Sequence, residues 1–307
     1  MPLPTDEHLI SLSRDLIGGL EKINGVHPGF RPAHAKGVLV SGSFTPSIEA
    51  AGLTRAPHAR PGTSTPVLVR FSDSTGIPSV ADNDPKAASP RGIAIRFQLG
   101  EHVHTDVIGH SANAFPARTG EEFLEFLTAA AEGRIEQFLG THPAALHFVT
   151  LAKPIPTSFA REAFFTLTAF KFTNAQGLSR FGRFRVVPAL GTEYLTNEAA
   201  AAKGPNFLFD ELSSRFAKGP VAFDLVVQVA EDGDTVDDAT VQWPDERRLL
   251  KFGTIELTSL VPDNIAEQKR IIFDPIPRVD GIHPSGDPLL DVRASVYLMS
   301  GRRRRQA

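Results

Sequence analysis

The chain has 307 residues, of which 41% are hydrophobic and 22% are charged, with a formal net charge of −3 and a pI near 6.4. These values are typical of a globular protein and do not indicate a nucleic-acid or membrane partner. There is no cysteine, which excludes disulfides, thiolate catalysis and Cys-based zinc or iron–sulfur sites. A cofactor would therefore be held by His, Tyr, Asp or Glu.

The first segment of the chain predicts an amphipathic helix over residues 5–23. Its apolar positions Leu9, Leu12, Leu16 and Leu20 recur at spacings of three and four. The segment lacks the basic start and the uninterrupted apolar stretch of a secretory signal, and no run in the chain reaches the ~18 apolar residues of a membrane span. We therefore expect a soluble, cytoplasmic protein.

Further elements follow from the apolar pattern. Thr119 and Glu122 form a capping box at the start of a predicted helix over residues 119–131. Additional helices are predicted at 132–140, 157–164, 207–217 and near 288–303, and strands at 36–44, 66–72, 92–98, 104–109, 165–173, 180–187, 219–230 and 253–260.

No repeat, low-complexity tract or linker interrupts the sequence, which favours a single domain over residues 1–307. Strands separated by long excursions, with helices clustered in blocks, indicate the α+β class around an antiparallel sheet. Eight or so strands in one domain are compatible with a closed barrel.

Two segments carry polar side chains where apolar ones would be expected. His34 lies between a Pro-bearing loop and a predicted strand, where a histidine often has no function at all. Arg70 and Ser72 lie two apart on a predicted strand, so they point to the same face. An arginine on that face either pairs with a buried anion or reaches solvent from an edge strand.

A third segment, RASVY at residues 293–297, lies in the last predicted helix. Arg293 and Tyr297 are four residues apart and therefore share a helix face. A close guanidinium favours the phenolate form of a tyrosine, and a phenolate is a hard anionic ligand that suits ferric iron. The alternative is a tyrosine that only forms a hydrogen bond at a helix end.

Taken together, these motifs resemble one family. RPAHAKG, VRFS, SPRGIAIRF, TDVIG and the closing GIHPS and RASVY, in that order, are similar to the haem catalases over roughly residues 25–304. The short subfamily of catalase-related peroxidases is the nearest match, because full-length catalases continue with a helical domain whereas this chain stops soon after Tyr297. The resemblance implies an eight-stranded antiparallel β-barrel with surrounding helices, a helix in residues 1–24, and haem b bound within residues 25–304.

The resemblance also implies roles for individual residues. Tyr297 would bind the iron, as in the Tyr-ligated haem of catalase, and Arg293 would keep it a phenolate. His34 would be the distal acid–base residue, and Ser72 would orient its ring. Among the other matching positions, Arg31, Arg70 and Arg304 correspond to arginines that bind the haem propionates, Phe115 and Phe123 to aromatic residues on the distal face, and Asp287 to an acid that supports Arg293.

The chain departs from the family pattern at two positions. His110 stands where catalases carry the distal Asn, and it is expected to act in catalysis with a charge that changes near neutral pH. Asn113 is an alternative replacement for the missing amide. Thr168 stands where the family has a His just before the Phe170-Lys171 pair.

The expected function is a haem peroxidase that reduces H2O2 or organic peroxides, oxidises a small organic donor and has weak catalase activity. A true minimal catalase and a non-enzymatic haem-binding barrel are the alternatives, and the pairing of His34 with Ser72 counts against the second. A lipocalin-like barrel without haem is a further alternative. A catalase-like allene oxide synthase would carry Thr before the distal His, where this chain has Ala33. The oligomeric state is open, with a homodimer as one option.

Overall fold

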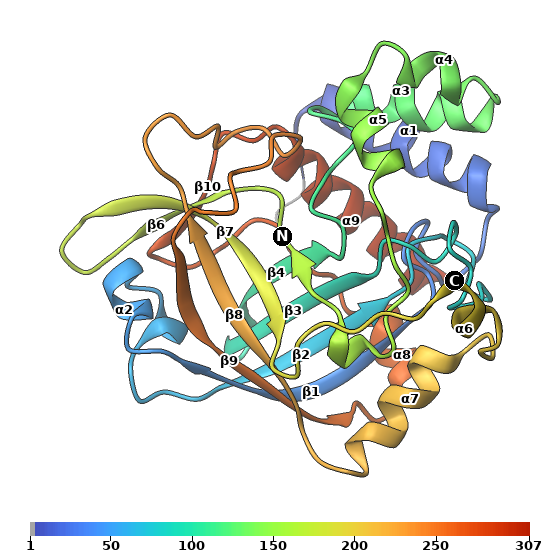
Figure 1. The fold of residues 1–307 in the computed structure, drawn as a ribbon. Coiled ribbons are helices and arrows are strands. Elements are labelled where there is room, and N and C mark those ends of the chain that lie inside the picture. Colours follow the sequence, from blue (N-terminus) through green and yellow to red (C-terminus); the bar gives the residue numbers. More distant parts are fainter. Residues whose placement is uncertain (1–3) are drawn as a thin grey trace.

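The computed structural model describes residues 4–307, whose strands form one antiparallel sheet (Figure 1). The strands pair in the order β10-β6-β7-β5-β4-β3-β2-β1-β9-β8, and an additional pairing of β7 with β8 closes the sheet into a barrel. The strands are β1 (Gly37–Pro46), β2 (Thr65–Ser72), β3 (Gly92–Gly100), β4 (Val103–His110), β5 (Phe164–Phe165), β6 (Phe170–Thr173), β7 (Ser179–Pro188), β8 (Val221–Val229), β9 (Leu249–Leu260) and β10 (Ile282–Pro284).

Eight strands complete the closed ring, namely β1 to β5, β7, β8 and β9. The predicted strand at 165–173 is divided into β5 and β6, which both pair with β7. The expectation of an eight-stranded antiparallel barrel of the α+β class is confirmed.

Phenylalanine side chains fill the barrel. Phe44 and Phe97 meet edge to face with ring centroids 5.0 Å apart, and Phe172 meets Phe184 in the same way at 5.3 Å. All four rings are buried, and edge-to-face packing is a favoured arrangement of aromatic pairs. A rigid apolar ring has no polar atom to satisfy, so it suits the interior of a small barrel.

The helices cover one flank and one end of the barrel. In Figure 1, α1, α3, α4 and α5 gather on one side, with α9 between them and the strands. Leu12 and Leu16 of α1 pack against Leu127 of α3 and Val296 of α9. No helix within residues 4–307 combines the length and apolar character needed to cross a bilayer. The helices are α1 (Glu7–Asn24), α2 (Ala50–Leu53), η1 (Pro57–Ala59), α3 (Gly120–Ala131), α4 (Ile135–Leu139), α5 (Pro143–Thr150), η2 (Phe159–Arg161), α6 (Asn197–Ala201), α7 (Phe207–Phe216), α8 (Asn264–Arg270) and α9 (Leu289–Gln306).

Most predicted helices are present, and one is wrong. The segment 157–164 holds only the 3₁₀ turn η2, because Ser158 caps it and the chain then extends into β5. Thr119 accepts a hydrogen bond from the Glu122 backbone, as the capping box requires. The Glu122 carboxylate, however, accepts from the backbone of Arg118 and not from that of Thr119. The helices α2, α5, α6 and α8, the 3₁₀ turn η1 and the strand β10 were not predicted.

Candidate haem site

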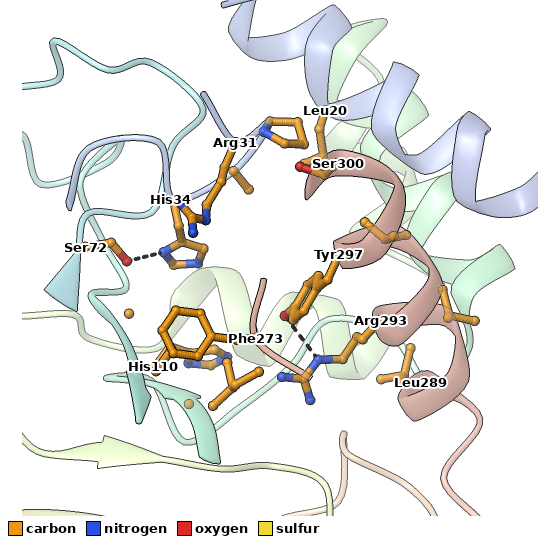
Figure 2. Close-up of a pocket in the computed structure, with 18 of the residues that line it drawn as sticks. Leu20, Arg31, His34, Ser72, His110, Phe273, Leu289, Arg293, Tyr297 and Ser300 are labelled. Carbon is orange, nitrogen blue, oxygen red and sulfur yellow. Dashed lines mark hydrogen bonds between the residues drawn. The ribbon is translucent and has the colours of Figure 1, made fainter. Parts of the chain in front are cut away.

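A cavity of about 280 Å³ lies between strands β2 to β4 of the barrel and the helices α1, α3 and α9. Figure 2 shows polar side chains on two opposite sides of it, with His34 and His110 on one side and Tyr297 with Arg293 on the other. The ten residues predicted to act in catalysis or to bind the haem all line this cavity: Arg31, His34, Arg70, Ser72, His110, Phe115, Phe123, Arg293, Tyr297 and Arg304.

One face of α9 forms the side with the tyrosine. Arg293, Tyr297, Ser300 and Arg304 follow one another at spacings of four, three and four, so a single helix face presents them all to the cavity. The Arg293 Nε–H donates to the Tyr297 hydroxyl oxygen at 3.3 Å. A guanidinium that donates to this oxygen stabilises the phenolate over the phenol. The predicted pairing of Arg293 with Tyr297 is therefore present.

Three arginines meet at one end of the cavity. Arg31 and Arg304 donate to the same backbone oxygen, that of Ile271, at 3.2 and 2.8 Å. Arg70 donates to the Gln268 side-chain oxygen at 2.8 Å and to the backbone oxygen of His34 at 2.9 Å. Within residues 4–307, none of the three arginines forms a salt bridge with a carboxylate. The three guanidinium groups are held by neutral oxygens.

This arrangement is electrostatically costly in the protein alone. Burial, together with the charge of Arg304, lowers the pKa of Arg70 to about 9. Burial also lowers the pKa of Arg304 to about 10, and that of Arg31 well below its ordinary value, where the charges of Arg70 and Arg304 add to the effect. The Nε of Arg304 is buried without a hydrogen-bond partner. Such a cluster fits an anionic ligand that supplies the missing carboxylates.

His34 occupies an unusual backbone conformation opposite Tyr297. Its φ is +56°, in the left-handed region that non-glycine residues rarely adopt. The loop fixes this conformation, because the His34 N–H donates to the Ser74 oxygen at 2.7 Å and the Ala35 N–H donates to the Thr75 oxygen at 2.9 Å. A strained residue that is held by its surroundings is typical of functional sites.

The Ser72 hydroxyl orients the ring of His34. Its Nδ1 lies 3.1 Å from the Ser72 hydroxyl, as the sequence predicted, so Nε2 is left for the cavity. Burial lowers the pKa of His34 to about 4, and the positive charge of Arg70 acts in the same direction. The ring is therefore neutral near pH 7 and able to accept a proton.

The surface next to the His34 ring is formed by three paired strands, and Gly92 lies on the central strand. Ser72 of β2 pairs with Gly92 of β3, which pairs with His110 of β4, so the three residues lie side by side. A Cβ on Gly92 would lie 2.7 Å from His34 Nδ1 and 2.6 Å from Ser72 Oγ. The sequence analysis missed Gly92. A glycine inside a strand pattern often marks such a close approach and could have indicated it.

Apolar side chains form most of the remaining wall. Phe115 and Phe123 pack against each other with ring centroids 5.2 Å apart, and Phe115 also stacks on His110 at 6.5 Å. The wall suits a flat apolar group, whose burial contributes roughly 25 cal/mol per Å². It is completed by Ile93, Ile108, Phe165, Leu167, Phe273, Leu289, Val292 and Val296.

The structure also places three further residues that the sequence analysis named, Asp287, Asn113 and Thr168. Asp287 makes no salt bridge with Arg293. Its carboxylate instead accepts from the Leu289 N–H at the start of α9. Asn113 does not line the cavity, and its backbone oxygen accepts from the Gln242 side chain, so it does not replace the missing amide. Thr168 does line the cavity.

The donor set fits haem. The two propionate carboxylates of haem would pair with the three guanidinium groups that have no carboxylate partner among residues 4–307. The haem macrocycle would pack against the apolar wall, and its ferric iron would bind the Tyr297 oxygen. The catalase family model matches residues 22–307. The chain belongs to the catalase family.

Individual proteins that are similar to this chain support the assignment to the family. A catalase-related peroxidase of Mycolicibacterium paratuberculosis is 37% identical over an alignment of 294 positions that covers 92% of this chain and 92% of its own. Another protein of that name, from Synechococcus elongatus, is 32% identical and covers 93% of this chain and 86% of its own. Among solved structures, a fungal catalase superposes with a TM-score of 0.81 at 24% identity, covering 99% of this chain. The chain spans 64% of that catalase's length.

Proposed function

We propose that this catalase-family protein is a haem peroxidase that reduces H2O2 and oxidises a small organic donor, with catalase activity as a minor reaction. One observation carries the proposal. The Arg293–Tyr297 pair faces the His34–Ser72 pair across a single cavity that ends in three arginines without carboxylate partners. The names of the relatives, catalase-related peroxidase, support the same reaction.

We infer that the haem is haem b. The chain has no cysteine, so a thioether attachment of the c type is chemically excluded. Arg31, Arg70 and Arg304 would hold the propionates by charge-assisted hydrogen bonds, and Tyr297 would hold the iron. The bound haem would supply the electrons that cleave the O–O bond and would accept electrons from the donor.

The residues of the chain would move the proton. His34 Nε2 takes a proton from one oxygen of H2O2 and returns it to the other, which leaves as water. Ser72 holds the opposite ring nitrogen and so fixes the direction in which Nε2 points. Arg293 donates its Nε–H to the Tyr297 oxygen and so holds that oxygen in place. General acid–base catalysis of this kind contributes roughly 10²–10⁴-fold to the rate.

A non-enzymatic haem-binding barrel would need no proton carrier. The strained backbone of His34 and the glycine space beneath its ring would have no purpose in such a protein. A minimal catalase differs from the proposed peroxidase only in the reductant, which would be a second H2O2.

The proposal is tested on the holoprotein as it is purified, without added haem. A pyridine haemochrome assay gives the haem type and its ratio to the chain. Oxygen release and oxidation of a bulky phenolic dye are then measured at equal peroxide. The proposal requires one haem b per chain and faster dye oxidation than oxygen release. Dominant oxygen release would establish the minimal catalase, and a lack of both reactions would establish the haem-binding barrel.

A further inference from the structure

His110 is the last residue of β4 and stands where catalases carry the distal Asn. Its register with Gly92 places it on the same barrel face as Ser72, and its ring lines the cavity. Figure 2 shows it on the His34 side, away from Tyr297. The ring also stacks on Phe115, with centroids 6.5 Å apart and an interplanar angle of 27°, which limits its rotation.

The hydrogen bond at Nδ1 defines the tautomer of this ring. The backbone N–H of Ala112 donates to His110 Nδ1 at 3.3 Å. A backbone N–H has no lone pair and can only donate, so Nδ1 is the unprotonated nitrogen. A neutral imidazole has one N–H and one lone pair, and its proton must then lie on Nε2. His110 therefore presents Nε2–H on the side of the ring away from its own backbone.

The surroundings keep the ring neutral. Burial lowers the pKa of His110 to about 3. Three basic groups, His34, Arg293 and Lys153, act in the same direction. The sequence-based expectation that its charge changes near neutral pH is therefore wrong, because that expectation took no account of burial.

His34 and His110 differ in what contacts Nδ1. The Nδ1 of His34 lies beside the Ser72 hydroxyl oxygen, which can accept a hydrogen bond from the ring, and a backbone hydrogen bond with Asp73 also favours a protonated ring. The Nδ1 of His110 meets a donor instead. The same residue type is therefore prepared for proton transfer at one position and for hydrogen-bond donation at the other.

We propose that His110 is a fixed, neutral hydrogen-bond donor, whose Nε2–H holds a peroxide oxygen in the distal cavity while His34 alone carries the proton. This role rests on the proposed haem peroxidase function and deepens it. In this role the neutral imidazole N–H of His110 would replace the N–H of a side-chain amide, and both groups are uncharged. A preorganised donor costs no reorganisation when the substrate arrives.

The tautomer is measured first, by ¹⁵N NMR of histidine-labelled holoprotein in the diamagnetic ferrous carbon monoxide form. The signals lost in His110→Gln identify the ring. The proposal requires the Nε2–H tautomer without titration from pH 5 to 9. An Nδ1–H tautomer, or a midpoint between pH 5 and 8, would overturn it. This readout is independent of peroxide turnover, so failure of the peroxidase assay would affect the proposed function alone.

Fluoride binding to the ferric holoprotein tests the donor itself, since fluoride at pH 7 accepts hydrogen bonds but donates none. His110→Leu should bind fluoride about tenfold more weakly, the effect of roughly one buried hydrogen bond. His110→Gln keeps an N–H donor and should stay within about twofold of the parent protein. His104→Leu, on the same strand but outside the cavity lining, should have no effect. Equal fluoride affinity in the Leu and Gln variants would reject the proposal.

Discussion

The guanidinium groups of Arg31 and Arg304, which are 273 positions apart in the chain, donate to one and the same oxygen, the backbone carbonyl of Ile271. Arg31 comes from the loop after α1 and Arg304 from the last turn of α9. Ile271 directly follows α8 and so joins the two elements. One neutral oxygen cannot neutralise two guanidinium charges. Bringing the two charges together therefore lowers the stability of the haem-free protein, and an anionic ligand would remove this effect.

Replacing Arg304 should therefore have opposite effects on stability and on haem binding. Arg304→Met removes a buried cation that is only 4% exposed, and the haem-free protein should become more stable by about 1–2 kcal/mol. The same variant should bind haem at least tenfold more weakly, because one propionate loses its partner. Denaturant unfolding and haem titration measure the two effects.

Arg302→Met is the matched control for that variant. Arg302 lies on the same helix and is exposed, so neither quantity should change appreciably. If Arg304→Met destabilised the haem-free protein and left haem affinity intact, Arg304 would only attach α9 to Ile271.

Tyr297→Phe should abolish the tyrosine-ligand absorption spectrum and lower haem retention on a desalting column at least tenfold. The variant keeps the ring and removes only the oxygen that Arg293 contacts. Tyr194→Phe is the natural control, since Tyr194 is the only other tyrosine of the chain and lies outside the cavity. An unchanged spectrum in Tyr297→Phe would refute Tyr297 as the ligand.

His34→Ala should keep haem but react with peroxide at least ~100-fold more slowly, because no general acid–base remains. In the parent protein, the rate constant should be level above pH 5 and fall as the pH drops through about 4, where His34 takes up a proton and can no longer act as a base. Stopped-flow mixing with H2O2 gives both results. A parental rate in His34→Ala would mean that another group, His110 first, carries the proton.

Gly92→Ala should impair the same step while leaving haem bound. The new Cβ would lie 2.7 Å from His34 Nδ1, closer than any real contact, so the ring must move and its hydrogen bond to Ser72 must break. Because the Cβ would also lie 2.6 Å from Ser72 Oγ, displacement of either group disturbs the orientation of the His34 ring. We expect a loss of about tenfold or more in the rate with peroxide, with an unchanged haem content. Gly52→Ala is the control, because nothing lies within 4 Å of its added Cβ. An unaltered rate in Gly92→Ala would show that His34 does not need the present ring position.

The sequence was sufficient for those parts of the site that lie on one element or within one motif. The spacing of Arg293 and Tyr297 along a predicted helix already placed them on one face, and α9 presents them so. Arg304, just beyond the predicted end of that helix, was assigned only through the resemblance to catalases. Ser72 was assigned to His34 only through the resemblance to catalases, since the two residues lie on separate segments.

Other features depend on contacts between distant segments. The position of Gly92 between Ser72 and His110 follows from the register of three strands, which no local pattern contains. The neutral state of His110 follows from its burial among distant segments, which the sequence does not show, so the sequence suggested the opposite. The split of the predicted strand 165–173 arises because β5 and β6 pair with different parts of β7.

His58 gives a last prediction, on stability, at a site away from the haem cavity. Its ring is 2% exposed and lies among Phe44, Phe97 and Phe252, with centroids 6.2, 4.8 and 5.6 Å away. Its Nδ1 is buried without a hydrogen-bond partner among the residues described. Burial lowers the pKa of His58 to about 4.

A histidine whose pKa is depressed by folding makes stability fall in acid. Between pH 6.5 and about 4 the unfolded chain binds a proton at His58 that the folded protein does not, so the free energy of unfolding decreases as the pH decreases. The loss from His58 alone is on the order of 3 kcal/mol at pH 4 relative to pH 7. His34 and His110 contribute with the same sign.

His58→Leu should therefore flatten the pH dependence of stability without removing it, and should raise stability at pH 7 by eliminating an unsatisfied nitrogen. Urea unfolding from pH 4 to 8 measures this, with His147→Leu, at an exposed position on α5, as the control. Equal slopes in His58→Leu and the parent protein would show that His58 is charged, or solvated, in the folded barrel.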